Sequence, residues 1–173
     1  MKRLLFIAHR VPYPPDKGER VRAFHEIRAL AEHFRVTVAA LAHSPEDRAA
    51  ARELEPGCDR VVTASAGGAV GLVRGAAALL CGAGVTEGDF RSRRLGRLLT
   101  REAARRPFDV VLAYSSGSLP YALSVPAGAR VADLVDADSA KWAAYAETAR
   151  RPTSWLYRRE ARGVARLEQQ ALR

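Results

Sequence analysis

The sequence predicts an α/β fold of the Rossmann-like, doubly wound type with a mostly parallel sheet. Apolar runs of strand length alternate with helical patterns along the chain, which is typical of βαβ units. The run FDVVLAY, at residues 108–114, is apolar almost throughout, as expected of a strand buried on both faces of a parallel sheet. A length of 173 residues suits one domain with a sizeable core.

The first forty residues fit a strand, a loop, a helix and a second strand. Residues 3–8 are an apolar run of strand length, and the Pro-rich loop 9–18 follows it. Apolar residues at three- and four-residue spacing then predict a helix over residues 19–33. Residues 36–42 form the second apolar run and predict the second strand.

The middle of the chain continues the alternation. Ser44, followed by a proline and two acidic residues, is typical of a helix N-cap, and Pro56 ends the short helix that starts there. Residues 59–64 predict a third strand. A Gly/Ala-rich helix is expected in part of residues 69–81, and a helix over residues 90–106 ends at the next proline.

The last third of the chain repeats the pattern twice. The strand at residues 108–114 leads to a short helix at 119–125, and residues 130–135 predict a fifth strand. A helix is expected over residues 140–150, and a final helix runs from residue 154 to the end, with a proline between the two.

The charge favours anionic partners. The formal net charge is +9, with 28 Lys and Arg against 19 Asp and Glu. Four arginines line one face of the helix predicted over residues 90–106: Arg94, Arg97, Arg101 and Arg105. A second basic-aromatic cluster lies at residues 155–159. Solvated helix faces are the first interpretation of both groups, and peripheral contact with an anionic membrane is the other. No helix-turn-helix, zinc-finger or RNP pattern accompanies the charge, so we do not expect a nucleic-acid partner.

Candidate site residues follow three of the predicted strands. Ligands of open parallel sheets bind beyond the carboxyl ends of the strands. The polar residues expected there are His9, Asp16, Lys17, Gly18 and Arg20 after the first strand, Ser115 and Ser116 after the fourth, and Asp136 and Lys141 after the fifth.

The loop after the first strand has features of a phosphate or sugar site. Gly18 has no Cβ, so a ligand can approach the backbone at the start of the helix, where Lys17 and Arg20 add positive charge. His9 is a candidate hydrogen-bond donor or acid–base group. A surface turn and a structural histidine are the alternatives. Neither a dinucleotide fingerprint nor a P-loop is present.

The two other groups each have a second interpretation as well. Ser115 and Ser116 are suited to hydrogen-bonding a sugar or phosphate, or to capping a helix. Neither serine has glycines on both sides at the G-x-S-x-G spacing of a hydrolase. Asp136 is expected to face the crevice, whereas Asp138 or Ser139 is expected to cap the next helix. No metal site is predicted, because the cysteines have no metal-type spacing.

Four segments resemble a known family, and they do so in order along the chain. The opening KRLLFIAHRVPYPPDKGERVRAFHEIRALAEHFRVTVAAL resembles the start of GT-B-fold glycosyltransferases of family 4, in particular the sugar transferases associated with exosortase/PEP-CTERM exopolysaccharide systems. FDVVLAYSSGSLPYAL, VADLVDADSAKWAAYA and WLYRREARGVARLEQQAL continue the resemblance, which therefore spans essentially the whole chain.

The resemblance implies a retaining, two-domain enzyme. Its N-terminal Rossmann-like half mainly binds the acceptor, and its C-terminal domain binds a nucleotide-diphosphate sugar as substrate, with no cofactor and no metal. Gly18 is then expected near the donor diphosphate or the transferred sugar, and Asp136 and Lys141 at the interdomain cleft. Ser115 and Ser116 line the cleft where many relatives carry a histidine.

On this resemblance, residues 1–152 are the acceptor-side domain and residues 153–173 are a helix leading towards a donor-binding domain that this chain lacks. We therefore expect no turnover by the chain alone, and no catalytic residue is assigned. The complete enzyme is expected to transfer a sugar to a lipid-linked glycan in exopolysaccharide synthesis, in the cytoplasm at the inner face of the membrane. The alternative is a stand-alone Rossmann-like module that binds a phosphorylated small ligand without catalysis.

Overall fold

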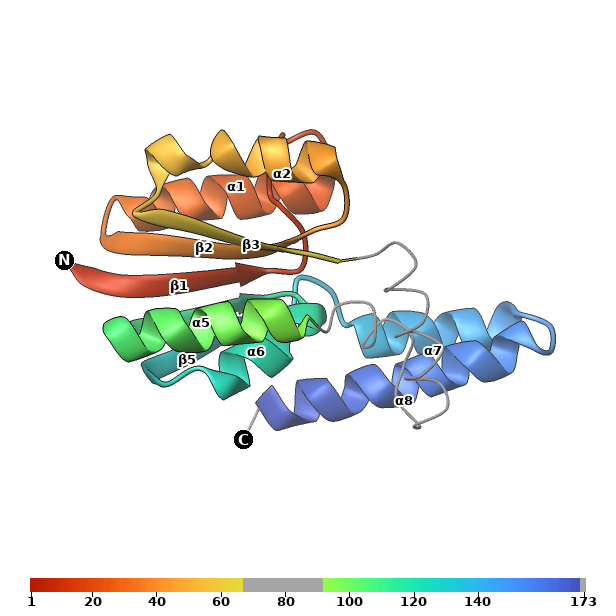
Figure 1. Ribbon diagram of the computed structural model, residues 1–173. Helices are drawn as coiled ribbons and strands as arrows, with labels where there is room; N and C mark the ends of the chain where they lie inside the picture. The colour runs from red at the N-terminus through yellow and green to blue at the C-terminus, as the bar shows by residue number, and fades with distance from the viewer. Residues whose placement is uncertain (67–91, 172–173) are drawn as a thin grey trace.

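A computed structural model describes residues 1–66 and 92–171 and confirms the predicted fold class. A five-stranded sheet in the order β3-β2-β1-β4-β5 lies between two layers of helices (Figure 1). All four strand pairs are parallel. The strands are β1 (Lys2–Ala8), β2 (Phe34–Ala42), β3 (Arg60–Ser65), β4 (Phe108–Tyr114) and β5 (Ala127–Asp133). The helices are α1 (Gly18–Ala31), α2 (Pro45–Arg52), α5 (Arg93–Arg105), α6 (Leu119–Ser124), α7 (Asp138–Thr148) and α8 (Thr153–Ala171), with short 3-10 turns η1 (Glu55–Gly57) and η2 (Ser116–Ser118).

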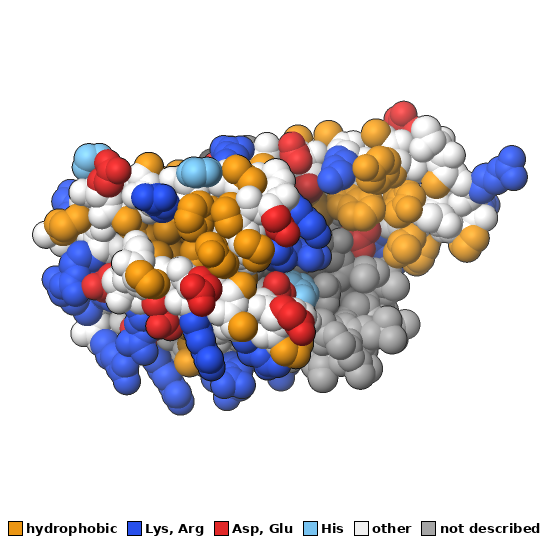
Figure 2. Space-filling view, turned by 90° about the horizontal axis from the view of Figure 1, so that it is seen from above, with side chains coloured by type: hydrophobic (Ala, Val, Ile, Leu, Met, Phe, Trp, Pro, Cys, Tyr) orange, Lys and Arg blue, Asp and Glu red, His pale blue; other side chains and the backbone are white. Residues whose placement is uncertain are grey.

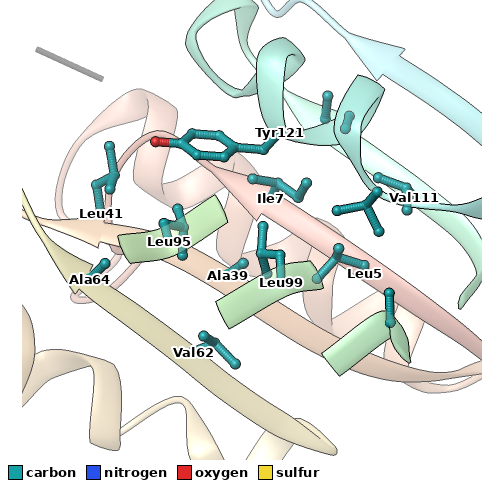
Figure 3. Packing of buried hydrophobic residues seen from close by; sticks show 14 of the residues in the cluster. Leu5, Ile7, Ala39, Leu41, Val62, Ala64, Leu95, Leu99, Val111 and Tyr121 are labelled. Atoms are coloured by element: carbon teal, nitrogen blue, oxygen red, sulfur yellow. The ribbon is translucent and has the colours of Figure 1, made fainter. Parts of the chain in front are cut away.

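β1 is the central strand, and its side chains alternate between two hydrophobic clusters. Leu5 and Ile7 point to the face covered by α5 and α6, where they pack with Leu99 (Figure 3). Leu4 and Phe6 point to the other face, which α1 and α2 cover. Because both faces of the strand are buried, an unbroken apolar run is what this position requires.

Several local predictions are confirmed by the structure. The Oγ of Ser44 accepts a hydrogen bond of 3.1 Å from the backbone N–H of Asp47, so Ser44 caps α2. β4 has the predicted bounds. The predicted helix within residues 69–81, and the first two residues of the helix predicted over 90–106, lie outside the described residues. The described part of that second helix is α5, capped by Ser92.

The bounds of β5 differ from the prediction at both ends. The strand starts at Ala127, three residues earlier than predicted, because pairing with β4 extends it through residues that carry no apolar signal. It ends at Asp133 rather than at residue 135, since Val135 has a left-handed φ of 64° and cannot continue a strand. The Asp133 carboxylate accepts a hydrogen bond of 2.9 Å from the backbone N–H of Val135, which stabilises this turn.

α7 and α8 form an antiparallel pair beside the sheet (Figure 1). The hydroxyl and the backbone N–H of Ser139 donate to the carboxylate of Glu168, which joins the start of α7 to α8. Leu167 and Ala171 of α8 pack against the core on the α5–α6 side. Among the described helices, none is both long enough and apolar enough to cross a bilayer.

Candidate functional site

A cavity of about 250 Å³ opens at the carboxyl ends of β1, β4 and β5. This is the edge at which open parallel sheets bind their ligands. Each strand contributes the residues that follow its last position, and the first turns of α1 and α7 close the sides. Five of the nine predicted site residues line this cavity: His9, Ser115, Ser116, Asp136 and Lys141.

The other four predicted residues lie at or near the start of α1 and do not line this cavity. The guanidinium of Arg20 forms ion pairs with Asp16 at 3.5 Å and with Asp47 at 3.3 Å, so its charge is used within the fold. Gly18 is the first residue of α1, and among the described atoms none lies within 4 Å of the place where a Cβ would stand. Lys17 takes the N-cap position of α1 without a side-chain cap bond.

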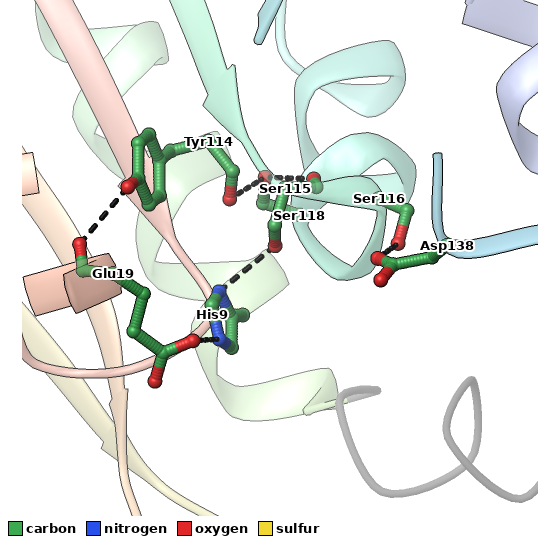
Figure 4. A network of polar contacts seen from close by, with 7 residues as sticks. All are labelled: His9, Glu19, Tyr114, Ser115, Ser116, Ser118 and Asp138. Carbon is green, nitrogen blue, oxygen red and sulfur yellow. Dashed lines mark hydrogen bonds and ion pairs between the residues drawn. The ribbon is translucent and has the colours of Figure 1, made fainter. Parts of the chain in front are cut away.

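Three side chains that line the cavity form one hydrogen-bonded chain. The Oγ of Ser115 lies 2.8 Å from Nδ1 of His9, and Nε2 of the same ring lies 3.3 Å from a carboxylate oxygen of Glu19 (Figure 4). The residues come from the end of β4, the end of β1 and the first turn of α1. Segments more than a hundred positions apart therefore meet in one hydrogen-bonded chain.

The direction of this chain follows from the charge on Glu19. The hydrogen bond from His9 holds the pKa of the Glu19 carboxyl below its ordinary value, and the charges of Arg10 and Arg20 act in the same direction against partial burial. A carboxylate only accepts hydrogen bonds, so Nε2 of His9 carries the hydrogen. In the neutral ring Nδ1 then holds a lone pair and accepts from the hydroxyl of Ser115.

The backbone at Ser115 is held in a strained conformation. Its φ of 75° and ψ of 158° lie in a region that is essentially reserved for glycine. The turn is fixed on both sides: the N–H of Ser115 donates to the carbonyl of Asp133 at 2.7 Å, and the hydroxyl of Ser118 donates to the carbonyls of Tyr114 and Ser115 at 2.9 Å each. Strain of this kind costs about 1–3 kcal/mol and clusters at functional sites.

A second polar group lies on the opposite wall. The hydroxyl of Ser116 donates to the Asp138 carboxylate at 2.6 Å, which joins the end of β4 to the first residue of α7. The prediction that Asp138 or Ser139 caps this helix is wrong. Ala137 holds the N-cap position, and both predicted capping residues bind elsewhere.

Nine residues that line the cavity are not among the predicted site residues. Five of them carry charged or aromatic side chains, namely Arg10, Glu19, Tyr114, Asp138 and Trp142, and the other four are Gly117, Leu134, Val135 and Val164. Trp142 is half-buried and packs against Tyr157 of α8, with ring centroids 5.4 Å apart, so the orientation of its ring is fixed. Glu19 lies in the first turn of α1 and Trp142 at the start of the second turn of α7, and both helices begin at the sheet edge. A position near the start of such a helix, directly after a strand-end loop, is the sequence signal that points to them.

The wall chemistry defines what the cavity is able to bind. Serine hydroxyls donate and accept, the carboxylates of Asp136 and Asp138 accept, and Lys141 and Arg10 bring positive charge. Within residues 1–66 and 92–171, no group of three His, Cys, Asp or Glu side chains is arranged to hold a metal ion. Comparison of the chain with protein-family models, with curated proteins and with solved structures finds no match.

Proposed function

We propose that this chain binds the sugar acceptor in a glycosyl transfer reaction, as the acceptor-side half of a GT-B glycosyltransferase of the family 4 type. The observation that carries the proposal is the cavity at the carboxyl ends of β1, β4 and β5, where hydroxyl, carboxylate, cationic and aromatic side chains converge. The resemblance of the four sequence segments supports it independently.

A sugar ring matches this set of side chains. Its hydroxyls both donate and accept. They find acceptors in the carboxylates of Asp136 and Asp138 and in the hydroxyl oxygens of Ser115 and Ser116, whose own hydrogens are donated to His9 and Asp138. Its apolar C–H face is able to pack on the ring of Trp142, since an aromatic side chain offers a flat apolar surface. The volume of about 250 Å³ lies below the 300–1,000 Å³ typical of whole drug-sized ligands, so it suits one ring of a larger acceptor.

The donor in this proposal is a nucleotide-diphosphate sugar held by a second domain. Arg10 and Lys141 stand at the cavity with positive charge, which suits them to contact a diphosphate or a lipid-linked phosphate. In keeping with the resemblance, the acceptor is a lipid-linked glycan of exopolysaccharide synthesis at the inner face of the cytoplasmic membrane.

Contact with that membrane is part of the proposal, and two surfaces support it. Arginines cover the exposed face of α5, while Leu95 and Leu99 on its other face are buried in the core, so this helix is suited to electrostatic contact without insertion. On α7 and α8, hydrophobic side chains gather at the surface (Figure 2). Trp155 and Tyr145 are 57% and 46% exposed there, as suits aromatic side chains at a lipid interface.

Saccharide binding by the chain is the first test. Saturation-transfer NMR with methyl glycosides, short glycans and nucleotide sugars should show signal transfer to the sugar ring. We expect the variant D138N to weaken binding about tenfold, the loss of one charge-assisted hydrogen bond. The variant S124A, whose hydroxyl donates to its own helix at 2.8 Å, should bind as the wild type does. If no saccharide shows saturation transfer from the protein, the proposal is wrong.

The second test separates transfer from binding alone. The complete gene product is incubated with a panel of labelled nucleotide sugars and membrane glycolipids, and labelled lipid is counted. Transfer supports the glycosyltransferase. Binding of phosphorylated ligands without preference for a sugar, and without transfer, supports the stand-alone binding module instead.

A further inference from the structure

The hydrogen bonds between Glu19, His9 and Ser115 run in the direction needed for a base to activate a hydroxyl. The Glu19 carboxylate fixes the imidazole through Nε2–H, and the lone pair of Nδ1 accepts the hydrogen bond of 2.8 Å from the Ser115 hydroxyl. Enzymes activate a serine hydroxyl with the same arrangement, in which a carboxylate orients an imidazole and the imidazole acts as the base for the hydroxyl. The ring of His9 is 13% exposed, so bulk water competes little for either nitrogen.

The position of Ser115 matches that role. It stands at a strained turn between β4 and the short helices η2 and α6, with Ala113 two residues before it and Gly117 two residues after it. A sharp strand-to-helix turn that exposes a serine hydroxyl at the top of a sheet is the backbone of a nucleophile elbow. Sequence reasoning dismissed this pattern for lack of a first glycine, yet Ala113 is a small residue at that place.

On the basis of the proposed function, we propose that these three residues form a proton relay that receives the proton of the attacking acceptor hydroxyl. Ser115 is the catalytic residue, since its Oγ touches the acceptor. His9 acts through Ser115, and Glu19 holds His9 in the required tautomer and pairs with it once it is charged.

The step balances as follows for a nucleoside-diphosphate sugar donor. The acceptor O–H proton moves to Oγ of Ser115 as the proton of Oγ moves to Nδ1 of His9. The freed electron pair of the acceptor oxygen forms the bond to the anomeric carbon. The bond from that carbon to the diphosphate oxygen breaks, and its electron pair leaves with the nucleoside diphosphate. His9 ends as an imidazolium paired with Glu19 and then loses a proton to solvent.

The relay is testable on the chain without a sugar, because a hydroxyl that gives up its proton easily also attacks phosphorus. With diisopropyl fluorophosphate, Oγ bonds to phosphorus, fluoride leaves and the proton goes to His9. We expect one adduct per chain, placed on Ser115 by tandem mass spectrometry and absent in S115A. H9Q should slow labelling about 100-fold or more, the usual range for loss of a general base.

Matched variants separate activation from a structural role. H25Q, which replaces an exposed histidine of α1, and E32Q, at the end of the same helix, should label at the wild-type rate. E19Q should slow labelling by less than H9Q does, because the base is still present. Free imidazole should partly restore labelling in H9A and not in S115A. A merely structural histidine is not replaced by imidazole in solution.

The pH dependence gives a further readout. The charged and titratable groups that line the cavity with His9 are Arg10, Glu19, Tyr114, Asp136, Asp138 and Lys141. A proton on Nδ1 removes the acceptor for Ser115, so labelling should fall in acid in the wild type and in H25Q, and this fall should be absent in H9Q. Identical pH profiles in the wild type and H9Q overturn the relay, as does failure to label Ser115 while chymotrypsin in the same tube reacts fully.

Two outcomes tell the relay apart from the proposed function. If the reagent labels Ser115 but the chain binds no saccharide, the hydroxyl is activated but has no role in glycosyl transfer. Transfer by the complete gene product at equal rates in wild type and H9Q, with no adduct on Ser115, keeps glycosyl transfer and removes the relay.

Discussion

The hydroxyl of Tyr114 donates a 2.9 Å hydrogen bond to the backbone carbonyl of Glu19. Tyr114 is the last residue of β4 and Glu19 lies in the first turn of α1, so this bond fixes the helix start against the strand end. The phenol is buried between Phe6 and the Arg22 guanidinium, and burial raises its pKa. The tyrosine therefore stays a donor at neutral pH and keeps the Glu19 side chain beside His9.

Relief of strain at Ser115 should be measurable. Glycine tolerates the φ of 75° that costs serine about 1–3 kcal/mol, whereas alanine keeps the strain and also loses the hydroxyl. We expect the free energy of unfolding of S115G to exceed that of S115A by about 1 kcal/mol, after allowance for the greater freedom of glycine in the unfolded chain. Urea denaturation measures both variants. A lower value for S115G contradicts the strained turn.

Two glycines predict opposite effects of the same substitution. A Cβ at Gly128 of β5 would stand 2.9 Å from the backbone oxygen of Asp109, and backbone cannot move aside as a side chain does. G128A should therefore destabilise the fold by about 1–3 kcal/mol. At Gly96, inside α5, the described atoms leave more than 4 Å around the Cβ, so G96A should stabilise the fold by about 0.5–1 kcal/mol. Thermal unfolding of G128A and G96A should show a lower unfolding temperature for the first and a higher one for the second. Equal changes in the two variants contradict the close packing at Gly128.

The carboxyl of Glu19 should make stability depend on pH in acid. Its pKa in the folded state lies below the ordinary value of 4.5, chiefly through the hydrogen bond from His9. Such a group stabilises the fold above its unfolded pKa, and this contribution is lost as the pH falls through the folded pKa. The difference in unfolding free energy between wild type and E19Q should be constant near neutral pH and shrink in acid.

The pKa of the Glu26 carboxyl is shifted in the opposite direction to that of Glu19. Burial and the charge of Asp133 raise the pKa of the Glu26 carboxyl against the effect of Arg22. A raised carboxyl pKa means that ionisation opposes folding, so E26Q should gain stability relative to wild type as the pH rises above the ordinary value. Urea denaturation at a series of pH values gives the difference in unfolding free energy between the wild type and each variant. This difference should change with pH in opposite directions for E19Q and E26Q, and a change in the same direction would contradict the opposite pKa shifts of the two carboxyls.

The thiol of Cys58 should react slowly. Burial raises its pKa from 9.0 to about 11, which leaves about 100-fold less thiolate near pH 8. In a C81S variant, which has Cys58 as its single thiol, the reaction with Ellman's reagent at pH 8 should be about 100-fold slower in the folded chain than in urea. Equal rates in the folded and the urea-unfolded chain contradict the partial burial of Cys58.

The protein should bind anionic membranes through the arginines of α5. Each arginine near a lipid surface contributes about 1 kcal/mol, so replacing Arg97, Arg101 and Arg105 together by alanine should weaken sedimentation with anionic vesicles roughly 100-fold. The matched control replaces three arginines from the other side of the sheet: Arg28, Arg48 and Arg52. Equal binding of the wild type to neutral and anionic vesicles removes electrostatic docking.

Sequence patterns predicted best those elements whose local signal agrees with their place in the fold. Six of the seven residues of β4 are apolar, and Ser44 begins a complete cap sequence, so the predictions for both are confirmed. β5 is an edge strand with mostly exposed residues, and its pairing with β4 defines its bounds. Pairing between distant segments leaves no periodic signal in the sequence, which is why its ends were misplaced.

The candidate site shows the same limit. His9 and Ser115 are predicted because they directly follow β1 and β4, and Asp136 because it lies within three residues of the end of β5; a strand end fixes where such residues lie. Glu19 and Trp142 depend on how the first turns of α1 and α7 are rotated, and packing against the sheet decides that rotation. Arg20 was predicted for its charge, which ion pairs with Asp16 and Asp47 now occupy.

The order of the strands has a consequence for synthesis on the ribosome. β1 is made before the other four strands of the sheet, yet Leu4 pairs with Val36 on one edge and with Val110, 106 positions after Leu4, on the other. Until β4 leaves the exit tunnel, the nascent chain therefore holds the middle strand of its sheet with one edge unpaired. Closing so distant a contact is slow. Slower translation between these strands should prolong the interval in which this edge is open to other chains or to a chaperone.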